Sequence, residues 1–394
     1  MAIKGRYSGA VVLPIVVGLL LAFLPVAPAF GAGINVPQLE LITWGRMEGG
    51  VFGFDTRGDM DLRIDGGYKF AGRVLFGFSS STLETAAFND MLTFTSARII
   101  LRDLFGIPLD FTYFVGEGET FCNGALFPEQ FGTVPISSRF HGFLHFPGGD
   151  FTYEGVYSPT GTGLALKWMP GEGRTLLSVY LYQDSWIDDS SDPATLDWGH
   201  FATDLRAALN FKRIKLEAFL GATYPVPDSS VGYYRGGLLF YAAEQSVEFL
   251  AQLGVPRWNP VLDAIDLDLF YLFVEPRVRF GAFAVVPSFF WRPRYFQNEE
   301  TRLIEDTGDQ AFDLNLDLQV GKPGEWPVGG GVEGNFVYQT ERGGTSVNEM
   351  ALKVSPYFRL LTSGVTWELR VAVNLLPFDV EDLAQIFLTV DAEF

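Results

Sequence analysis

Long stretches in which apolar and polar residues strictly alternate constrain this chain more than any other feature. In residues 311–321 every second residue is apolar, from Phe312 to Val320, and Asp, Asn or Gln lies between them. The same alternation recurs in residues 350–360 and 365–375. Because residues i and i+2 share one face of a strand, each stretch predicts a strand with one apolar face. At roughly ten residues these strands exceed the usual length of about five or six in soluble sheets.

The carboxyl-terminal stretch, residues 383–394, continues this pattern to the end of the chain. Every second residue from Ala384 to Phe394 is apolar, and polar residues lie between them apart from Phe387. This ending resembles the closing strand of Gram-negative outer-membrane β-barrels, in which the terminal aromatic residue belongs to the signal read by the barrel-insertion machinery. The resemblance implies a porin-like barrel in the outer membrane, with Phe394 in that signal and the carboxyl terminus in the periplasm.

The connections between the expected strands alternate in length, which fits the short periplasmic turns and longer outer loops of such barrels. A tally of strands reaches about eighteen if residues 60–78 are divided in two, with residues 41–54 as one strand. We expect an undivided segment there and hence an all-β, antiparallel transmembrane barrel of about 16 strands, within a range of 14–18. The barrel should be closed because lipid cannot pair with an open sheet edge.

The amino terminus predicts an exported protein. Lys4 and Arg6 precede an uncharged apolar run, and small residues follow it near Ala29 and Ala32. This order is typical of a secretory signal peptide, which we expect over residues 1–32 with cleavage after one of residues 29–32. Residues 33–394 would then form one barrel domain.

Composition excludes several functions. A formal net charge of −19 disfavours nucleic-acid binding, and the single cysteine, Cys122, excludes an intramolecular disulfide. There are three histidines; His141 and His145 lie four apart in an apolar context without the zinc-protease motif. No serine-hydrolase elbow is present either. We therefore expect no enzyme activity, no metal and no cofactor.

Charged residues fall on the polar faces of the expected strands. A charge facing the lipid at the bilayer centre costs roughly 2–4 kcal/mol, so these residues should face the barrel interior. They would line a pore, or alternatively form a salt-bridge lattice in a filled barrel, and the width of about 16 strands favours a pore. The expected pore-lining residues are Arg63, Arg206, Lys215, Glu217, Asp313, Asp317, Glu333, Lys353, Arg359, Glu368 and Arg370.

Residues 116–160 form an unusually long connection after the fifth expected strand. A porin constriction loop follows the fifth strand and folds into the lumen, so this arrangement resembles one. The expected constriction residues are Glu117, Glu119, Glu129, Arg139 and Asp150. An outer cap, an adhesin loop, or two further strands at residues 140–146 and 151–157 are the alternatives.

Together these features predict an outer-membrane channel for passive diffusion of small hydrophilic solutes. A transporter for hydrophobic solutes and a non-conducting surface adhesin or scaffold barrel are the alternatives, the first because Phe is enriched in residues 116–160. The expected partners are outer-membrane lipid, the barrel-insertion machinery and small solutes, and porin-like barrels often form homotrimers.

Overall fold

The computed structural model describes most of the chain after residue 32. The described residues are 33–48, 51–80, 92–138, 155–170, 173–184, 201–224, 232–297, 304–306, 310–321, 326–342, 345–378 and 383–393. The expected signal peptide and Phe394 lie outside them, so both stay predictions.

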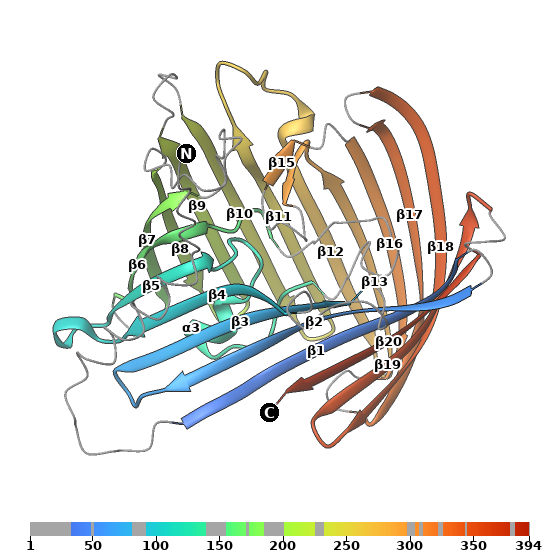
Figure 1. Cartoon of the computed structure of the whole chain (residues 1–394), viewed down its shortest axis with the longest axis horizontal. Coiled ribbons are helices and arrows are strands. Elements are labelled where there is room, and N and C mark those ends of the chain that lie inside the picture. Colours follow the sequence, from blue (N-terminus) through green and yellow to red (C-terminus); the bar gives the residue numbers. More distant parts are fainter. Residues whose placement is uncertain are drawn as a thin grey trace, which may run out of the picture.

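Among the described residues, eighteen strands form one antiparallel sheet that closes on itself, because β1 pairs with both β2 and β20 (Figure 1). The all-β, closed-barrel prediction is therefore confirmed. Each barrel strand pairs with its neighbour in sequence. The barrel strands are β1 (Gly33–Glu48), β2 (Val51–Asp65), β3 (Phe70–Ser80), β4 (Leu92–Leu101), β5 (Leu109–Glu117), β6 (Thr160–Trp168), β7 (Thr175–Asp184), β8 (Phe201–Asn210), β9 (Ile214–Tyr224), β10 (Tyr233–Glu244), β11 (Val247–Trp258), β12 (Tyr271–Phe280), β13 (Phe283–Arg292), β16 (Gln310–Val320), β17 (Val328–Arg342), β18 (Thr345–Thr362), β19 (Val365–Leu376) and β20 (Ala384–Glu393).

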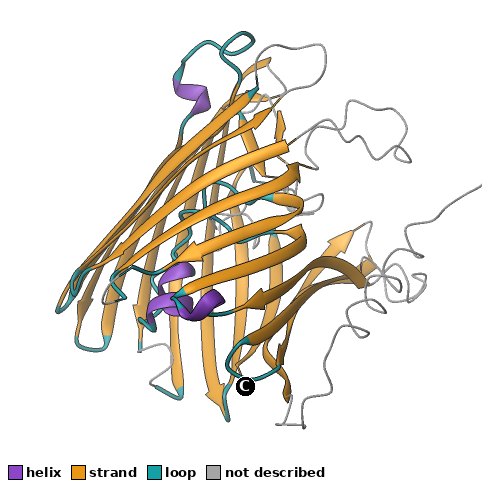
Figure 2. Cartoon of the chain, turned by 90° about the vertical axis from the view of Figure 1, so that its left-hand side faces the viewer, coloured by secondary structure: helices purple, strands orange, loops and turns teal. Residues whose placement is uncertain are grey.

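A few short elements lie in the connections between barrel strands, as Figure 2 shows. β14 (Tyr295–Gln297) and β15 (Ile304–Asp306) pair as a small hairpin. The helical turns are η2 (Leu104–Gly106), α3 (Leu126–Phe131) and η4 (Leu267–Leu269). Within the described part of the chain, no helix is long and apolar enough to span a membrane.

The barrel has eighteen strands among the described residues, which is more than the preferred value of about 16 and at the upper end of the expected range of 14–18. Residues 60–78 do divide, into the end of β2 and most of β3, at a turn where Gly67 has a φ of 92°. That positive φ is accessible to glycine at little cost. The expected strand 41–54 is also wrong, because it contains the junction between β1 and β2.

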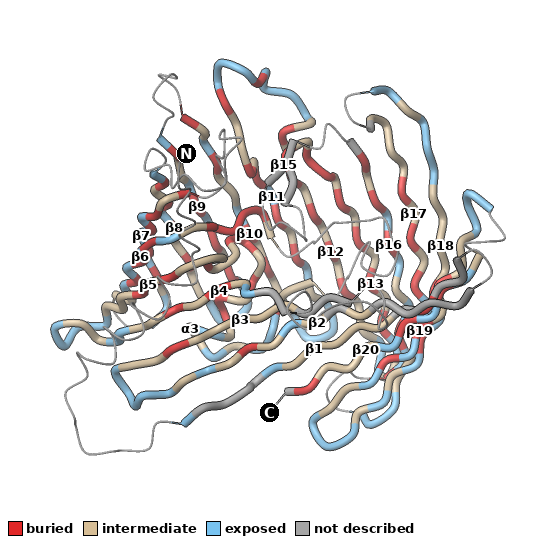
Figure 3. Tube along the Cα trace, in the orientation of Figure 1, coloured by how far each residue is buried: buried red, intermediate tan, exposed pale blue. Residues whose placement is uncertain are grey.

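The outer face of the barrel wall is apolar, and buried and more exposed residues alternate along the strands in Figure 3. On β16, Leu314, Leu316 and Leu318 are 44–47% exposed, whereas Asp313 and Asn315 are buried. Exposed apolar side chains on this scale form the surface that a bilayer covers. The carboxyl-terminal strand follows the same rule: Ile386 and Leu388 are exposed outward.

Phe387, the exception in the terminal pattern, is fully buried and packs with Ala372 and Ile42. It therefore belongs to the inner face, where it pairs in register with Arg370 of β19 and Trp44 of β1. An aromatic side chain at an expected polar position thus fills space inside the barrel.

Candidate pore constriction

The described start of the long connection between β5 and β6, residues 118–138, contacts side chains on the inner face of the barrel. We call it the 118–138 segment. Gly116, the second-last residue of β5, has a φ of 84°. A Cβ atom there would lie 2.2 Å from the carbonyl oxygen of Thr95. Only glycine meets both conditions, so this residue sets the direction in which the segment departs.

Glu119 forms the first anchor of the segment. Its carboxylate pairs with Lys167 of β6, lies 3.1 Å from Nη1 of Arg206 on β8, and accepts a hydrogen bond of 3.0 Å from the Tyr180 hydroxyl. Nη1 of Arg98 on β4 lies 3.9 Å away. Three cationic side chains from three strands therefore converge on one carboxylate.

The backbone of the segment is held by the same wall residues. Arg98 donates to the Gly118 carbonyl oxygen at 2.8 Å, and Arg206 donates to that of Thr120 at 3.3 Å. Glu217 accepts a hydrogen bond of 2.6 Å from the backbone N–H of Cys122. Buried charged side chains are thus paired both with one another and with main-chain groups, as stable burial of charge requires.

The far end of the segment is anchored on β12. Ser138 donates from its hydroxyl to Glu275 at 2.6 Å, and Arg277 donates to the carbonyl oxygens of Ser137 at 2.8 Å and Ile136 at 3.2 Å. Between the two anchors, Glu129 pairs with Arg73 of β3 at 3.1 Å. The segment therefore contacts both β3 and β12, strands well separated around the barrel.

The apolar side chains of the segment complete a core inside one part of the barrel. Phe121, Phe127 and Ile136 are fully buried. The Phe121 ring lies 5.0 Å from that of Tyr180 and 4.9 Å from that of Phe219. The core cluster continues along the inner faces of β5–β13. This part of the interior is packed with side chains, as a salt-bridged and filled barrel would be.

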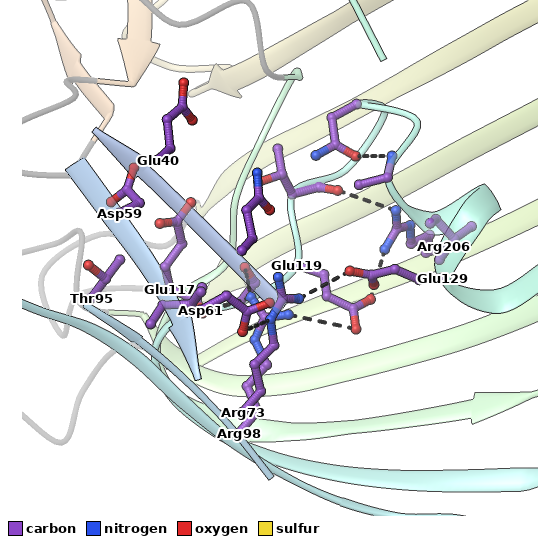
Figure 4. Close-up of a pocket in the computed structure, with 17 residues that line it drawn as sticks. Glu40, Asp59, Asp61, Arg73, Thr95, Arg98, Glu117, Glu119, Glu129 and Arg206 are labelled. Atoms are coloured by element: carbon purple, nitrogen blue, oxygen red, sulfur yellow. Dashed lines mark hydrogen bonds and ion pairs between the residues drawn. The ribbon is translucent and has the colours of Figure 1, made fainter. Parts of the chain in front are cut away.

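A cavity of about 250 Å³ lies between the segment and strands β1–β4 (Figure 4). Its lining is strongly charged, with six carboxylates and three guanidinium groups. In Figure 4 Glu40, Asp59 and Glu117 lie near one another, and Arg73 and Arg98 lie apart from them, near Asp61 and Glu119. The remaining charged lining residues are Glu129 and Arg206. Opposed charges across a water-accessible opening create a transverse field.

The environment of the segment perturbs two of its ionisable groups. Burial opposes ionisation of Glu119, but Lys167, Arg206 and Arg98 outweigh it and hold the pKa of this carboxyl well below its usual range. Burial, with a smaller effect of the Glu217 charge, raises the pKa of the Cys122 thiol. Glu119 therefore stays charged at neutral pH, and Cys122 stays a neutral thiol.

The structure places the expected constriction residues in two groups. Glu117, Glu119 and Glu129 all line the cavity, whereas Arg139 and Asp150 lie outside the described residues. Of the expected pore-lining residues, which we call the expected wall residues, Arg206 and Glu217 form the first anchor with Glu119.

The other expected wall residues lie apart from that anchor. Lys215 is buried, with Nζ 5.3 Å from the centre of the Tyr241 ring, and Arg63 is half exposed and pairs with Asp61 at 3.0 Å. The remaining seven lie together on the inner faces of β16–β19, and they are Asp313, Asp317, Glu333, Lys353, Arg359, Glu368 and Arg370.

An ion-pair network joins most of that second group. Arg370 pairs with Glu333 and, at 2.9 Å, with Glu368, which also accepts a bond of 2.5 Å from Arg359. Asp313 accepts a hydrogen bond of 2.7 Å from Asn335, and Lys353 is half-buried on β18. No group of three or more His, Cys, Asp or Glu side chains in the described residues is arranged to hold a metal ion.

Sequence reasoning missed Arg73, Arg98, Lys167 and Arg235. Each of them lies an even number of residues from other inward-facing residues of its strand. Counting every second residue along the strand would therefore have found them. Arg235 pairs with Asp204 at 2.6 Å and lies over the Tyr157 ring, 4.4 Å from its centre. The irregular pattern of the amino-terminal strands obscured the alternation around Arg73 and Arg98, and the glycines of β10 obscured it around Arg235.

No protein-family model matches the chain, and no curated protein matches it either. Among solved structures, it is similar to Wzi of Escherichia coli, described as an outer-membrane, carbohydrate-binding β-barrel involved in Group 1 capsule assembly. The identity is 10%, the match covers 99% of this chain and 90% of Wzi, and the TM-score is 0.51.

Two further solved structures are also similar to the chain. A mutant of Rh. blastica porin is 9% identical, with 92% of this chain and 100% of that one covered and a TM-score of 0.43. Pseudomonas putida OprB is 10% identical, with 92% and 94% covered and a TM-score of 0.44.

The likeness to Wzi shows the fold. A closed barrel of this architecture with an exposed apolar belt has the form of a transmembrane β-barrel.

Proposed function

We propose that this barrel is a channel for passive diffusion of small hydrophilic solutes, narrowed by the 118–138 segment. The observation that carries the proposal is the cavity between the segment and β1–β4, which six carboxylates and three guanidinium groups line. Such a lining stabilises water and polar solutes and disfavours apolar ones. This argues against a path for hydrophobic solutes.

The proposed mechanism is physical sieving combined with a transverse field. The core along β5–β13 blocks that part of the interior, so solutes would pass between the segment and the polar walls of β1–β4 and β16–β20. The anchors at Glu119 and Ser138 hold the segment in place, and its position would determine the size of the passage.

Single-channel recording of the refolded mature protein in a planar bilayer tests this proposal. The key variant replaces residues 121–136 with a short Gly/Ser linker. Stable ohmic steps in the wild type, with larger steps in the variant, are expected. A correctly folded and inserted wild type that never conducts would overturn the channel proposal. The control is Arg213→Gln, which removes a charge at the exposed β8–β9 turn, away from the cavity, and should leave the step size unchanged.

A non-conducting surface barrel is the second candidate. The buried core and the two anchors favour it, because they close much of the interior. Wzi, which has a similar fold, is described as a carbohydrate-binding barrel. An electrically silent protein that retains immobilised polysaccharide on an affinity gel would support this candidate.

The proposal also includes a cleaved signal peptide over residues 1–32, recognition of Phe394 by the insertion machinery, and homotrimer assembly. Amino-terminal sequencing of the exported protein tests the first. Deletion of Phe394 should reduce the amount of inserted barrel, and chemical cross-linking in native membranes should yield a trimer.

A further inference from the structure

The inner face of β16 carries a row of oxygen-bearing side chains around Asp317. Asn315 and Gln319 flank it at i−2 and i+2 and are 5% exposed, and Asp317 itself is less completely buried. Asp317 and Glu333 of β17 face each other in register. Two carboxylates therefore lie side by side on the same inner wall.

The hydrogen-bond partners of Asp317 among the described residues are neutral side chains. Its carboxylate accepts hydrogen bonds from Nε2 of Gln319 at 2.6 Å and from the Tyr357 hydroxyl at 3.0 Å. It forms no ion pair with a described residue. Arg370 of β19 instead bridges Glu333 and Glu368. No ion pair among the described residues therefore neutralises the Asp317 carboxylate.

Two amide oxygens on the same face of β16 also have unused hydrogen-bonding capacity. Asn315 donates from Nδ2 to Glu333 at 2.7 Å, which fixes its amide next to the carboxylate pair. Its Oδ1 atom, and the Oε1 atom of Gln319, are buried without a hydrogen-bond partner among the described residues. Buried acceptors without partners cost free energy and are usually matched by a bound group.

The charges of this wall leave room for one cation. Asp317, Glu333 and Glu368 contribute three negative charges, and Arg359 and Arg370 contribute two positive ones. Asp313 and Lys353, which lie in neighbouring rows of the same strands, balance each other in formal charge. These seven residues therefore carry a formal excess of one negative charge.

We propose that Asp317, with the side-chain oxygens of Asn315 and Gln319, forms a binding station for a monovalent cation on the inner wall of the channel. A small ammonium group or a partly dehydrated alkali ion fits, because oxygen acceptors and a single excess charge are the features that both recognise. As a station along the solute path it rests on the proposed function. It makes the channel cation-preferring.

Reversal potentials under a KCl gradient at pH 8, together with block of the potassium current by methylammonium, test the station. The wild type is expected to prefer potassium over chloride, and Asp317→Asn should lower that permeability ratio by about twofold or more. The same variant should relieve methylammonium block, and Asp317→Glu should restore both. The control Glu244→Gln removes one charge at an exposed turn and should change neither.

An Asp317→Asn channel with unaltered selectivity and block would overturn the station while leaving the channel intact. If the wild type is silent, the proposed function fails, and the station is tested separately. Methylammonium chloride should then raise the thermal unfolding midpoint of the wild-type barrel in micelles more than that of Asp317→Asn at equal ionic strength. Equal shifts in the two proteins would reject the station. If methylammonium raises the midpoint of the wild type more than that of the variant, but sodium and potassium chloride do not, the station binds ammonium groups and not alkali ions.

Discussion

Arg206 on β8 places Nη2 2.8 Å from Oε1 of Glu217 on β9, and that same oxygen accepts the backbone N–H of Cys122 at 2.6 Å. One buried ion pair in the wall therefore also holds the segment that crosses the interior. Stability of the barrel and position of the segment are linked through this pair.

Arg206→Met should strongly destabilise the barrel, because it leaves Glu217 buried without its cationic partner. Removing one member of a buried ion pair costs about 3–5 kcal/mol. Urea unfolding in lipid vesicles measures the loss. Arg213→Gln is the matched control, since its pair with Glu244 is exposed and should contribute about 1 kcal/mol or less. Equal losses in the two variants would show that Arg206 does not hold the anchor.

Gly116→Ala should displace the segment and destabilise the barrel, because a Cβ atom would meet the Thr95 carbonyl oxygen at 2.2 Å and φ is positive. Gly173→Ala is the control: its φ is 71°, but the space around it is open. Backbone strain alone costs about 1–3 kcal/mol. The unfolding free energy of the first variant should fall further than that of the second, and an equal fall would contradict the close approach.

The Glu119 anchor should survive mild acid. Its folded pKa lies below the usual value of about 4.3, so its stabilisation is fully present above that value and is lost as pH falls through the folded pKa. The thermal midpoint of the wild type should therefore exceed that of Glu119→Gln from pH 5 to 8 by a constant amount. The difference should shrink only in stronger acid. A difference that disappears between pH 7 and 5 would contradict the depressed pKa.

Cys122 should resist thiol reagents in the folded barrel at pH 8, because it is fully buried and its pKa is raised. Labelling with a maleimide should become complete only after unfolding in urea with detergent. Lys212→Cys in a Cys122→Ser background provides an exposed control at the β8–β9 turn. Rapid labelling of native Cys122 would show that the core around it opens.

Many residues of the candidate site could be predicted from the alternation of side chains between the two faces of each strand. The expected wall residues, from Arg206 to Arg370, lie on inward positions, because a strand turns successive side chains to opposite faces and lipid excludes charge from one of them. Strand number was harder to predict. The β1–β2 junction lies within an apparently continuous pattern, and a short turn does not interrupt alternation.

The partners of the 118–138 segment could not be predicted. Glu119 lies in a connection without periodicity, and its partners Lys167 and Arg206 come 48 and 87 residues later. Side-chain parity indicates which face a residue occupies but not which residues of other strands stand opposite it. Strand tilt, register and the path of the connection decide that.

The sequence by itself determined that this chain is an all-β barrel with an apolar exterior and a charged interior, because period-two alternation and the cost of unpaired backbone groups in lipid act locally along every strand. Only the tertiary structure decided that the interior is divided between a packed core along β5–β13 and polar walls around the rest. That division depends on contacts between residues far apart in the sequence, which form only when the sheet closes and brings them together.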